Sequence, residues 1–428
     1  MKQYLERTGF AAFSVSLLAW GWVEGILSMT ISLDLTFAAV AMGVLKAEID
    51  ALTFAAFLGI SGFIYFVHRF RAGADLATYD GGTLTAIVPV YEDAAVLERS
   101  VGSLTDSAYE DVEVVVVCEP DDRATRRAAE RLAEAPNVSC LVNEGNPGSK
   151  AGAINYALEQ TEGEYVGVFD ADELVDPEFL PHAVGEFAAD PDLDAVQGRT
   201  VPEPDGVIES IAYYESVLMS FVVLRLAYLL TGFRMAVSRC IVFRRSALES
   251  LGGYDPDMLT EDFAFTYDAY KERVNVTEML QYPSRIDAAH TPSDWWGQRK
   301  RWMTGYTQVL HQQLTDIRPV TDHRNLLSAG ICFSTVTGSL FLITLISKFA
   351  ILLVVGSETF FLTPIGVMLG VTGGAHYLDY REGTVSRPGL GLLLVPFIFP
   401  LYSLAAVKAM FEYVGSWQGE WYRVTKRV

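Results

Sequence analysis

The stretch YVGVFDADE, residues 165–173, joins a short apolar run to two closely spaced carboxylates. The run 165–169 predicts a β-strand, and Asp170 and Asp172 follow at its carboxyl end. Carboxylates two residues apart at a strand end can both reach one hard cation such as Mg²⁺ or Mn²⁺. Such a metal neutralises the charge that builds on a leaving diphosphate. The same pattern also occurs in solvated turns, so other residues must support a metal site.

Strand-like and helix-like patterns alternate along the chain before this stretch. The predicted strands are 84–90, 112–117, 138–142 and 165–169, and the predicted helices are 92–104, 122–135 and 151–160. Alternation at this spacing predicts an α/β fold with a mostly parallel sheet covered by helices. Ligands of such sheets bind at the carboxyl ends of the strands. The residues just after each strand are therefore the candidates for a site.

Apolar segments concentrate at the two ends of the chain. Those long enough to cross a bilayer are 10–33, 51–67, 326–346, 349–371 and 389–407. Basic residues flank the first two segments and predict an in–out–in entry, with the central domain in the cytoplasm. The predicted regions are 1–75, with about two transmembrane helices; 76–320, cytoplasmic; and 321–428, with three or four membrane segments. Arg423, Lys426 and Arg427 favour the cytoplasm, so one late segment is interfacial or re-entrant, or a fourth crossing exists.

The composition narrows the choice of partners. A formal net charge of −21 repels nucleic acid phosphates, so nucleic acid is not an expected partner. Acidic residues are spread along the whole chain, which is typical of proteins adapted to high salt and also compatible with an ordinary acidic enzyme. The four cysteines form no C-x-x-C pair, so neither a structural zinc site nor a disulfide framework is expected.

Three motifs lie at strand ends or helix starts within the central domain. After the first strand, Pro89, Tyr91 and Glu92 offer a ring and a carboxylate for a nucleobase and ribose. After the second strand, Glu119 and Asp122 place further acids at the same predicted edge. The run GSKAGAIN, residues 148–155, opens a helix, so Lys150 and the helix N-terminus could meet a phosphate. Each of these residues could instead serve a turn or a helix cap.

Two further motifs follow the strand region. In Thr260-Glu261-Asp262, a carboxylate facing the cleft could take a proton from an attacking hydroxyl, and the triplet could equally be a helix N-terminus capped by Thr260. The run QRKRW, residues 298–302, precedes the returning apolar segments. Its cations could attract anionic lipid, or they could hold a pyrophosphate while the indole stacks on a sugar ring.

Taken in order, these motifs resemble the membrane-bound family 2 glycosyltransferases, the group of cellulose, chitin and hyaluronan synthases. The resemblance covers about Leu84 to Trp302, with apolar segments on both sides as in that family. It implies a nucleotide-diphospho-sugar transferase domain, GT-A and Rossmann-like, in the cytoplasm and flanked by transmembrane helices. It also implies inverting transfer from a nucleotide-diphosphate donor, UDP-sugars foremost, to a growing polysaccharide or a lipid-linked glycan, with Mg²⁺ or Mn²⁺.

The resemblance further implies roles for single residues. Asp170 and Asp172 would hold the metal beside the donor sugar, and Asp262 would be the general base. The residues around the nucleotide and the donor would be Pro89, Tyr91, Glu92, Glu119, Asp122, Lys150, Asp170 and Glu261. The residues at the diphosphate and the acceptor channel would be Gln298, Arg299, Arg301 and Trp302, with the Trp302 indole as the channel floor.

Two departures from the family pattern stand out. Glu119 occupies a position where the family usually has Asp, so contacts to the base or ribose would differ. No Phe-x-Val-Thr-x-Lys gating segment and no cyclic-dinucleotide-binding domain follow Trp302, which argues against cellulose synthesis. A different class, a membrane transporter or channel with a cytoplasmic nucleotide-sensing domain, is the alternative. Glu24, Lys348 and Lys408 offer it no clear ion path, and no internal repeat is evident.

Overall fold

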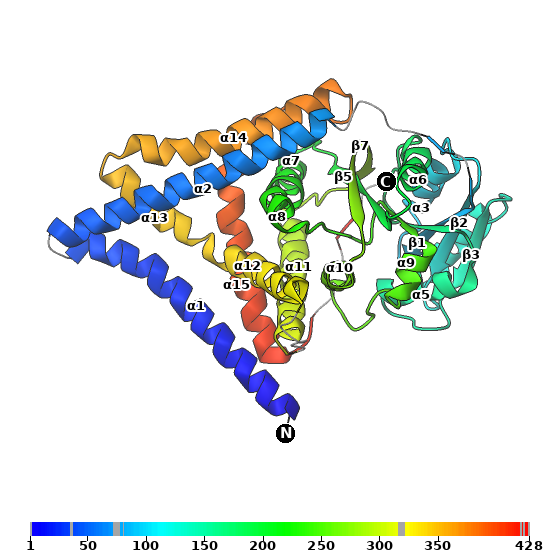
Figure 1. The fold of residues 1–428 in the computed structure, drawn as a ribbon, viewed down its shortest axis with the longest axis horizontal. Coiled ribbons are helices and arrows are strands. Elements are labelled where there is room, and N and C mark those ends of the chain that lie inside the picture. Colours follow the sequence, from blue (N-terminus) through cyan, green and yellow to red (C-terminus); the bar gives the residue numbers. More distant parts are fainter. Residues whose placement is uncertain are drawn as a thin grey trace. The chain divides into compact units, whose positions relative to one another are not determined.

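The computed structural model describes residues 2–34, 37–71, 78–79, 81–315, 322–419, 422 and 424–426, without the side chains of residues 2–3, 25–40 and 341. Its contacts divide the chain into two compact units, which interleave along the sequence (Figure 1). The helical unit comprises Met1–Phe66, Pro204–Gly232 and Ala289–Val424. The sheet unit comprises Val67–Glu203, Phe233–Ala288 and Thr425–Val428.

A seven-stranded sheet in the order β3-β2-β1-β4-β6-β5-β7 forms the centre of the sheet unit. The strands are β1 Leu84–Val90, β2 Val112–Cys118, β3 Val138–Val142, β4 Tyr165–Val168, β5 Ala195–Pro202, β6 Ile241–Arg244 and β7 Val276–Ile286. The first four strands run parallel to one another. Strand β6 runs antiparallel to both of its neighbours, β4 and β5. The predicted α/β fold is confirmed, as a mixed sheet.

Alternating side chains of the strands fill two cores, one on each face of the sheet. In β1, for example, Ala86 and Val88 join one core whereas Ile87 joins the other. The first core is closed by α3 Leu97–Thr105, α4 Arg123–Leu132 and α6 Phe179–Ala189, and the second by α5 Lys150–Gln160, α9 Arg245–Ser250 and α10 Glu261–Lys271. Because the inner strands are buried on both faces, their sequences are nearly continuous apolar runs.

The predicted strands match the structure closely, but the first predicted helix was too long. Helix α3 begins at Leu97 and not at Glu92. The backbone of Glu92 has a φ of +56°, in the left-handed region, and Asp93 N donates to Thr125 Oγ1 at 2.9 Å. These residues form a turn at the sheet edge, so a helix cannot include them.

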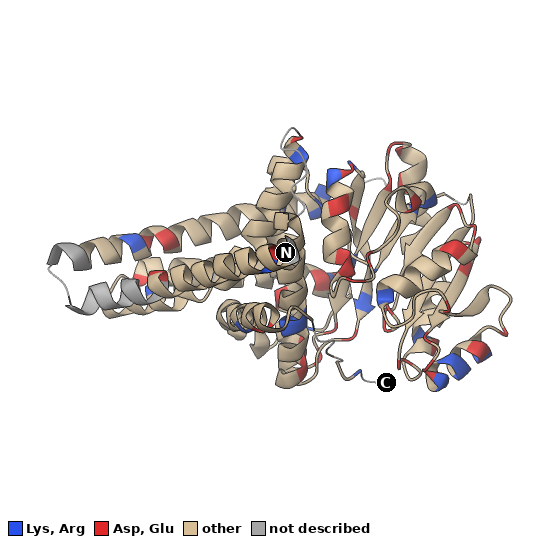
Figure 2. Ribbon diagram, turned by 90° about the horizontal axis from the view of Figure 1, so that it is seen from below, with Lys and Arg blue, Asp and Glu red and all other residues tan. Residues whose placement is uncertain are grey.

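The helical unit consists of helices of different lengths. They are α1 Lys2–Asp34, α2 Phe37–Arg71, α7 Val207–Glu215, the π-helix Ser216–Val222, α8 Leu224–Thr231, α11 Pro292–Thr315, α12 His323–Phe341, α13 Thr344–Val354, α14 Glu358–Arg381, the 3₁₀ turn Leu390–Leu394 and α15 Val395–Ser416. Within the described residues, four segments are long and apolar enough to cross a membrane: Ala41–Arg71, Val207–Thr231, Glu358–Arg381 and Leu390–Ser416. Charged residues are sparse along the long helices and frequent in the sheet unit (Figure 2).

Two of the predicted membrane segments have different bounds in the structure. The segment 326–346 is interrupted between α12 and α13, which are bent by 51°. The segment 349–371 is divided where Gly356, with a φ of +75°, ends α13 before α14 begins. The apolar segment Val207–Thr231 was not predicted, because it lies inside the region assigned to the cytoplasm.

Other predictions fall partly on residues outside the described part of the chain. The first apolar segment, 10–33, lies within α1, but the side chains of its residues 25–33 are not described. Arg423, Arg427 and the region boundaries near residues 75 and 320 lie outside the described residues. The division into 1–75, 76–320 and 321–428 therefore stays a prediction, and the contacts place Pro204–Gly232 in the helical unit.

Candidate active site

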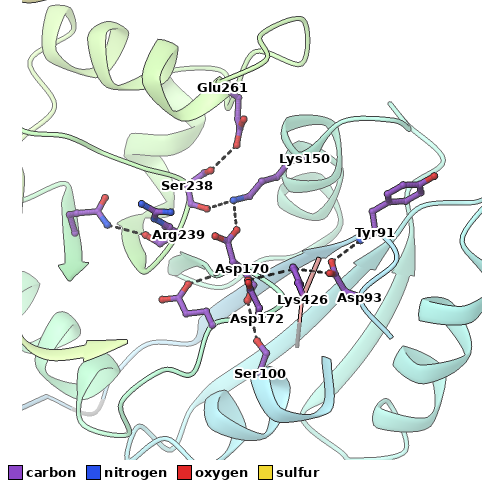
Figure 3. Close-up of polar contacts among 12 residues, drawn as sticks. Tyr91, Asp93, Ser100, Lys150, Asp170, Asp172, Ser238, Arg239, Glu261 and Lys426 are labelled. Carbon is purple, nitrogen blue, oxygen red and sulfur yellow. Dashed lines mark hydrogen bonds and ion pairs between the residues drawn. The ribbon is translucent and has the colours of Figure 1, made fainter. Parts of the chain in front are cut away.

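The Asp-x-Asp motif lies where the predicted strand ends, at the carboxyl edge of the sheet. Strand β4 ends at Val168, and Asp170 and Asp172 follow in a turn. Lys150 Nζ, at the first residue of α5, donates to Asp170 Oδ1 and to the carbonyl oxygen of Ser238, both at 2.6 Å (Figure 3). Ser100 of α3 donates to the Asp170 carbonyl oxygen at 3.1 Å. The motif is thus held from both faces of the sheet.

The two carboxyl groups of this motif differ electrostatically. Burial acts to raise the pKa of Asp170, but Lys150 and then Arg239 outweigh it and leave that pKa below its usual value. Burial, together with Asp170 and Asp93, raises the pKa of Asp172 to about 6, although Lys426 opposes this. For Lys150, burial would lower the pKa, and the carboxylates Asp170 and Glu261 more than compensate, so its pKa is raised.

A third carboxylate, Asp93, completes an acidic group near Asp172. Lys426 Nζ lies 2.7 Å from Asp93 Oδ1 and 3.6 Å from Asp172 Oδ1 (Figure 3). Among the described residues, no three His, Cys, Asp or Glu side chains already form a metal cage. Even so, the ammonium group of Lys426 lies between the carboxylates of Asp93 and Asp172, so a positive charge already occupies this place. Carboxylate oxygens are the type of ligand that Mg²⁺ and Mn²⁺ prefer. The residues present therefore fit a divalent cation with other ligands from solvent or substrate.

The predicted general base lies at the start of a helix near this group. Helix α10 begins with Glu261 and Asp262, and the negative field of both carboxylates reaches Lys150. Glu261 Oε1 accepts a hydrogen bond from Ser238 Oγ at 2.7 Å. Thr260 precedes the helix as predicted, but within the described structure its hydroxyl makes no capping hydrogen bond. Asp262 is partly exposed, so its carboxylate can meet a substrate.

Ser238 and Arg239 belong to the same group and were missed by the sequence analysis. Strand β6 is antiparallel to β4, with Ile241 paired to Val168. The residues before β6 therefore lie at the same edge as the residues after β4. The sequence analysis considered only residues that follow a strand, which is sufficient when all strands are parallel. In an antiparallel strand such as β6, the residues that precede the strand lie at this edge. Asp93 follows Tyr91 and Glu92 directly and could have been included, whereas Lys426 has no local signal in the sequence.

The residues predicted to surround the nucleotide lie at the ends of β1 and β2. Tyr91 and Glu92 are exposed, and Pro89 is half-buried in β1. Asp122 Oδ1 accepts from Thr125 N at 3.1 Å at the start of α4, and its other oxygen accepts from Glu92 N. Asp122 thus shapes the turn that presents Tyr91 and Glu92.

Glu119 is also occupied by contacts within the protein. Its carboxylate oxygens accept from Asn143 Nδ2 at 3.0 Å and from Gly148 N at 2.6 Å. These bonds connect the end of β2 to the loop before α5, the helix that begins with Lys150. Glu119 therefore holds this loop in place. Its position beside a nucleotide stays a prediction.

The motif QRKRW lies on α11, in the helical unit. Arg299 is buried, and its Nε lies 2.8 Å from Glu215 Oε1. Its guanidinium stacks on Trp302, with 4.7 Å between Arg299 Cζ and the ring centroid. Lys300 Nζ pairs with Glu412 of α15 at 2.8 Å. Gln298 and Arg301 are partly exposed. The motif belongs to a different unit from the carboxylates, so its place at the donor remains a prediction.

The fold is shared with a solved glycosyltransferase. The mannosyltransferase PcManGT from Pyrobaculum calidifontis, solved in complex with GDP-Man and Mn²⁺, matches this chain with a TM-score of 0.53. The match covers 86% of this chain and 99% of that one, at 22% sequence identity. The sheet unit is therefore a GT-A-like mixed α/β fold.

The sequence then gives the family. The profile of the glycosyltransferase-like family 2 matches residues 81–305, and this chain belongs to that family. The poly-β-1,6-N-acetyl-D-glucosamine synthase of Staphylococcus aureus (strain COL) is 25% identical over 232 residues, which are 53% of this chain and 55% of that protein. The synthase of the same name from Staphylococcus epidermidis is 24% identical over 234 residues, with the same two shares. The chain spans about half the length of the curated relatives it matches.

Proposed function

We propose that this chain is a membrane-embedded, inverting glycosyltransferase. It moves a sugar from a nucleotide-diphosphate donor, a UDP-sugar in the first instance, to a growing polysaccharide or a lipid-linked glycan. The observation that carries the proposal is the meeting of Asp170, Asp172, Lys150 and the Glu261–Asp262 pair at one edge of the sheet. Membership of the glycosyltransferase-like family 2 and the likeness to synthases of a polysaccharide support it.

The donor site lies at the ends of β1, β2 and β4. Tyr91 and Glu92 present an exposed ring and carboxylate to the base and ribose. Asp170 and Asp172 would hold Mg²⁺ or Mn²⁺, and the bound ion would supply positive charge to balance that of a departing diphosphate. Lys150 keeps the Asp170 carboxylate ionised and oriented, because its ammonium group donates to Asp170 and to the Ser238 carbonyl. The solved mannosyltransferase with the same fold contained GDP-Man and Mn²⁺, in agreement with this assignment.

Asp262 is the proposed base for the acceptor hydroxyl. Its neighbour Glu261 is buried and bonded to Ser238, whereas Asp262 is partly exposed at the first turn of α10. Of the two carboxylates, Asp262 is therefore the one that can reach an acceptor. It takes the hydroxyl proton as the oxygen attacks the anomeric carbon, and the bond from that carbon to the diphosphate breaks. Attack opposite the leaving group inverts the anomeric centre.

The helix α11 supplies the proposed contacts to diphosphate and acceptor. Gln298, Arg301 and Trp302 are spaced at i, i+3 and i+4, so they share one face of that helix. Arg299 and its partner Glu215 brace the helix from inside the helical unit. Arg301 offers a planar set of donors for diphosphate oxygens, and the Trp302 indole offers stacking area to a sugar ring.

The proposed location is the cell membrane, with several crossings and the sheet unit in the cytoplasm, where nucleotide sugars are present. In the part of the chain that the structure describes, four helices have the necessary length and apolar composition. Regions 1–75 and 321–428 would provide most of the crossings around the region 76–320. The family assignment makes the chain a glycosyltransferase, and no observation favours the transporter or channel alternative.

The experiment is a donor panel on the purified full-length chain in lipid. UDP-glucose, UDP-N-acetylglucosamine, UDP-glucuronate and GDP-mannose are each incubated with Mn²⁺ or Mg²⁺, and free nucleotide diphosphate is measured. We expect release from one donor well above the others, even without acceptor, and loss of release with Asp172→Asn. Equal background release from all donors by correctly folded protein would contradict the proposal.

A further inference from the structure

Lys426, which follows α15, brings a cation to the carboxylate group from a part of the sequence far from every predicted motif. Its Nζ lies 2.7 Å from Asp93 Oδ1 and 3.6 Å from Asp172 Oδ1. The lysine side chain is 29% exposed, whereas those of Asp93 and Asp172 are 10% and 17% exposed. Figure 3 shows the lysine between the two carboxylates. This is a partly desolvated contact and not a pair on the open surface.

Asp93 is fixed so that it can hold this lysine. Its Oδ2 accepts from Tyr91 N at 3.1 Å, and its own backbone N–H donates to Thr125 Oγ1 at 2.9 Å. Its other carboxylate oxygen is left for Lys426. The turn that presents Tyr91 to solvent therefore also positions the ammonium group beside Asp172.

The position of this ammonium conflicts with a divalent cation on Asp172. Like charges a few ångströms apart repel each other strongly where water is partly excluded. A metal ion that binds Asp172 must therefore displace Lys426 or share the carboxylate with it. Asp170 has an ammonium partner of its own, Lys150, whose Nζ lies 2.6 Å from Asp170 Oδ1.

We infer that Lys426 is an internal cation of the donor site, which neutralises Asp93 and Asp172 and competes with the divalent metal for Asp172. The inference rests on the proposed function, because it assigns Asp172 to the metal. It deepens that function in one respect: a metal ion that binds Asp172 displaces Lys426 from this carboxylate or shares the carboxylate with it, and either lowers the metal affinity. The segment that carries Lys426 thus occupies the donor site before metal and donor arrive.

Binding of Mn²⁺ to the purified full-length chain in lipid tests the inference without any transfer reaction. Free Mn²⁺ is measured by its electron paramagnetic resonance signal during a titration, with no nucleotide present. We expect Lys426→Met to bind Mn²⁺ on the order of tenfold more tightly than wild type, since one positive charge near the ion is removed. Lys426→Arg keeps the charge, so its Mn²⁺ affinity should stay close to that of wild type, within about threefold.

The matched control is Arg126→Met, which removes one positive charge from an exposed pair with Glu130 in α4. Its Mn²⁺ affinity should equal that of wild type. Equal or weaker binding by Lys426→Met overturns the inference, as does equal tightening by Arg126→Met. Weaker nucleotide diphosphate binding with unchanged Mn²⁺ affinity also overturns it, because Lys426 would then be a ligand of the donor. If Asp172→Asn binds Mn²⁺ like wild type, the proposed metal site itself fails, which is a separate result.

Discussion

Asp170 and Asp172 are separated by a single residue, yet the fold shifts the pKa values of their carboxyl groups in opposite directions. The pKa of Asp170 is lowered despite burial, whereas burial raises that of Asp172 to about 6. The difference comes from partners on other elements: Lys150 begins α5, and Lys426 follows α15. Two residues that are equivalent in the motif are therefore not equivalent in the site, and their variants should behave differently.

We expect Asp172→Asn to abolish sugar transfer while the protein stays folded. The replacement has nearly the same shape, and it removes a carboxylate whose charge is disfavoured by burial. Transfer is measured with the donor found in the panel, and folding by thermal melting. Wild-type protein in excess chelator should lose transfer in the same way. Full activity of the variant, or of wild type with chelator, would show that no metal acts through Asp172.

Asp262→Asn should slow the chemical step by about 10²–10⁴-fold and leave nucleotide binding intact. The reason is that Asp262 removes a proton but does not hold the metal in the proposed mechanism. Single-turnover rates and nucleotide affinity are measured on the same preparation. A loss of nucleotide affinity equal to that of Asp172→Asn would move Asp262 into the binding site. Full activity of Asp262→Asn would mean that Asp262 is not the base and serves only as an acidic residue in the first turn of α10.

At the scale of elements, the loop before α5 depends on the end of β2. Glu119 accepts from Asn143 Nδ2 and from Gly148 N, and it is 7% exposed. Glu119→Ala removes the acceptor of Gly148 N and one of the two acceptors of Asn143 Nδ2, so we expect a loss of about 1–3 kcal/mol in the free energy of unfolding. Urea unfolding of the variant measures it. Glu134→Ala, at an exposed site with the same change of charge, is the control and should change little.

Helix α11 carries a second prediction at this scale. Trp302→Ala should reduce acceptor-dependent transfer more than acceptor-independent donor hydrolysis, because the indole would contact the acceptor and not the donor. Lys300→Ala should change neither rate, since Lys300 pairs with Glu412 on another helix. Membrane association should be unchanged in both variants. If both variants lose both rates equally, or only detach from lipid, the motif is a membrane contact.

The elements themselves were largely predictable. Strands β1 and β3 match the predicted residues, because a strand buried on both faces is an apolar run that ends at polar residues. The prediction for the first helix was wrong at its start, because residues 92–96 precede α3. The backbone N–H groups of Glu92 and Asp93 donate to side chains at the start of α4, and these contacts hold a turn in place of a helix. The long apolar segments 326–346 and 349–371 were wrong in their bounds. Helix α12 ends at Phe341 inside the first segment, and the left-handed backbone of Gly356 separates α13 from α14 inside the second.

For the whole molecule, the net charge of −21 leads to a prediction about salt. We expect the melting temperature of the detergent-solubilised protein to rise between ~0.1 M and molar potassium chloride. Repulsion among carboxylates is screened as the Debye length falls from about 10 to 3 Å. A melting temperature that is constant or falls over this series would mark an ordinary acidic protein and not one adapted to high salt.

The sequence by itself determined the class of fold, the family resemblance and most of the residues at the sheet edge. These follow from apolar periodicity and from polar residues at strand ends, both of which are local properties of the chain. Asp170 and Asp172 were named at a strand end, and Lys150 and Glu261 at predicted helix starts. The structure brings Asp170, Lys150 and Glu261 together.

Only the tertiary structure decided which charges face one another. Ser238 and Arg239 reach the site because β6 runs antiparallel, and Lys426 reaches it because the chain after α15 returns to the sheet unit. It also showed that Arg299 is used within the helical unit, by Glu215. Strand direction and long-range return of the chain leave no local pattern in a sequence. Pairing of charges depends on them, because electrostatic contacts act through space and not along the chain.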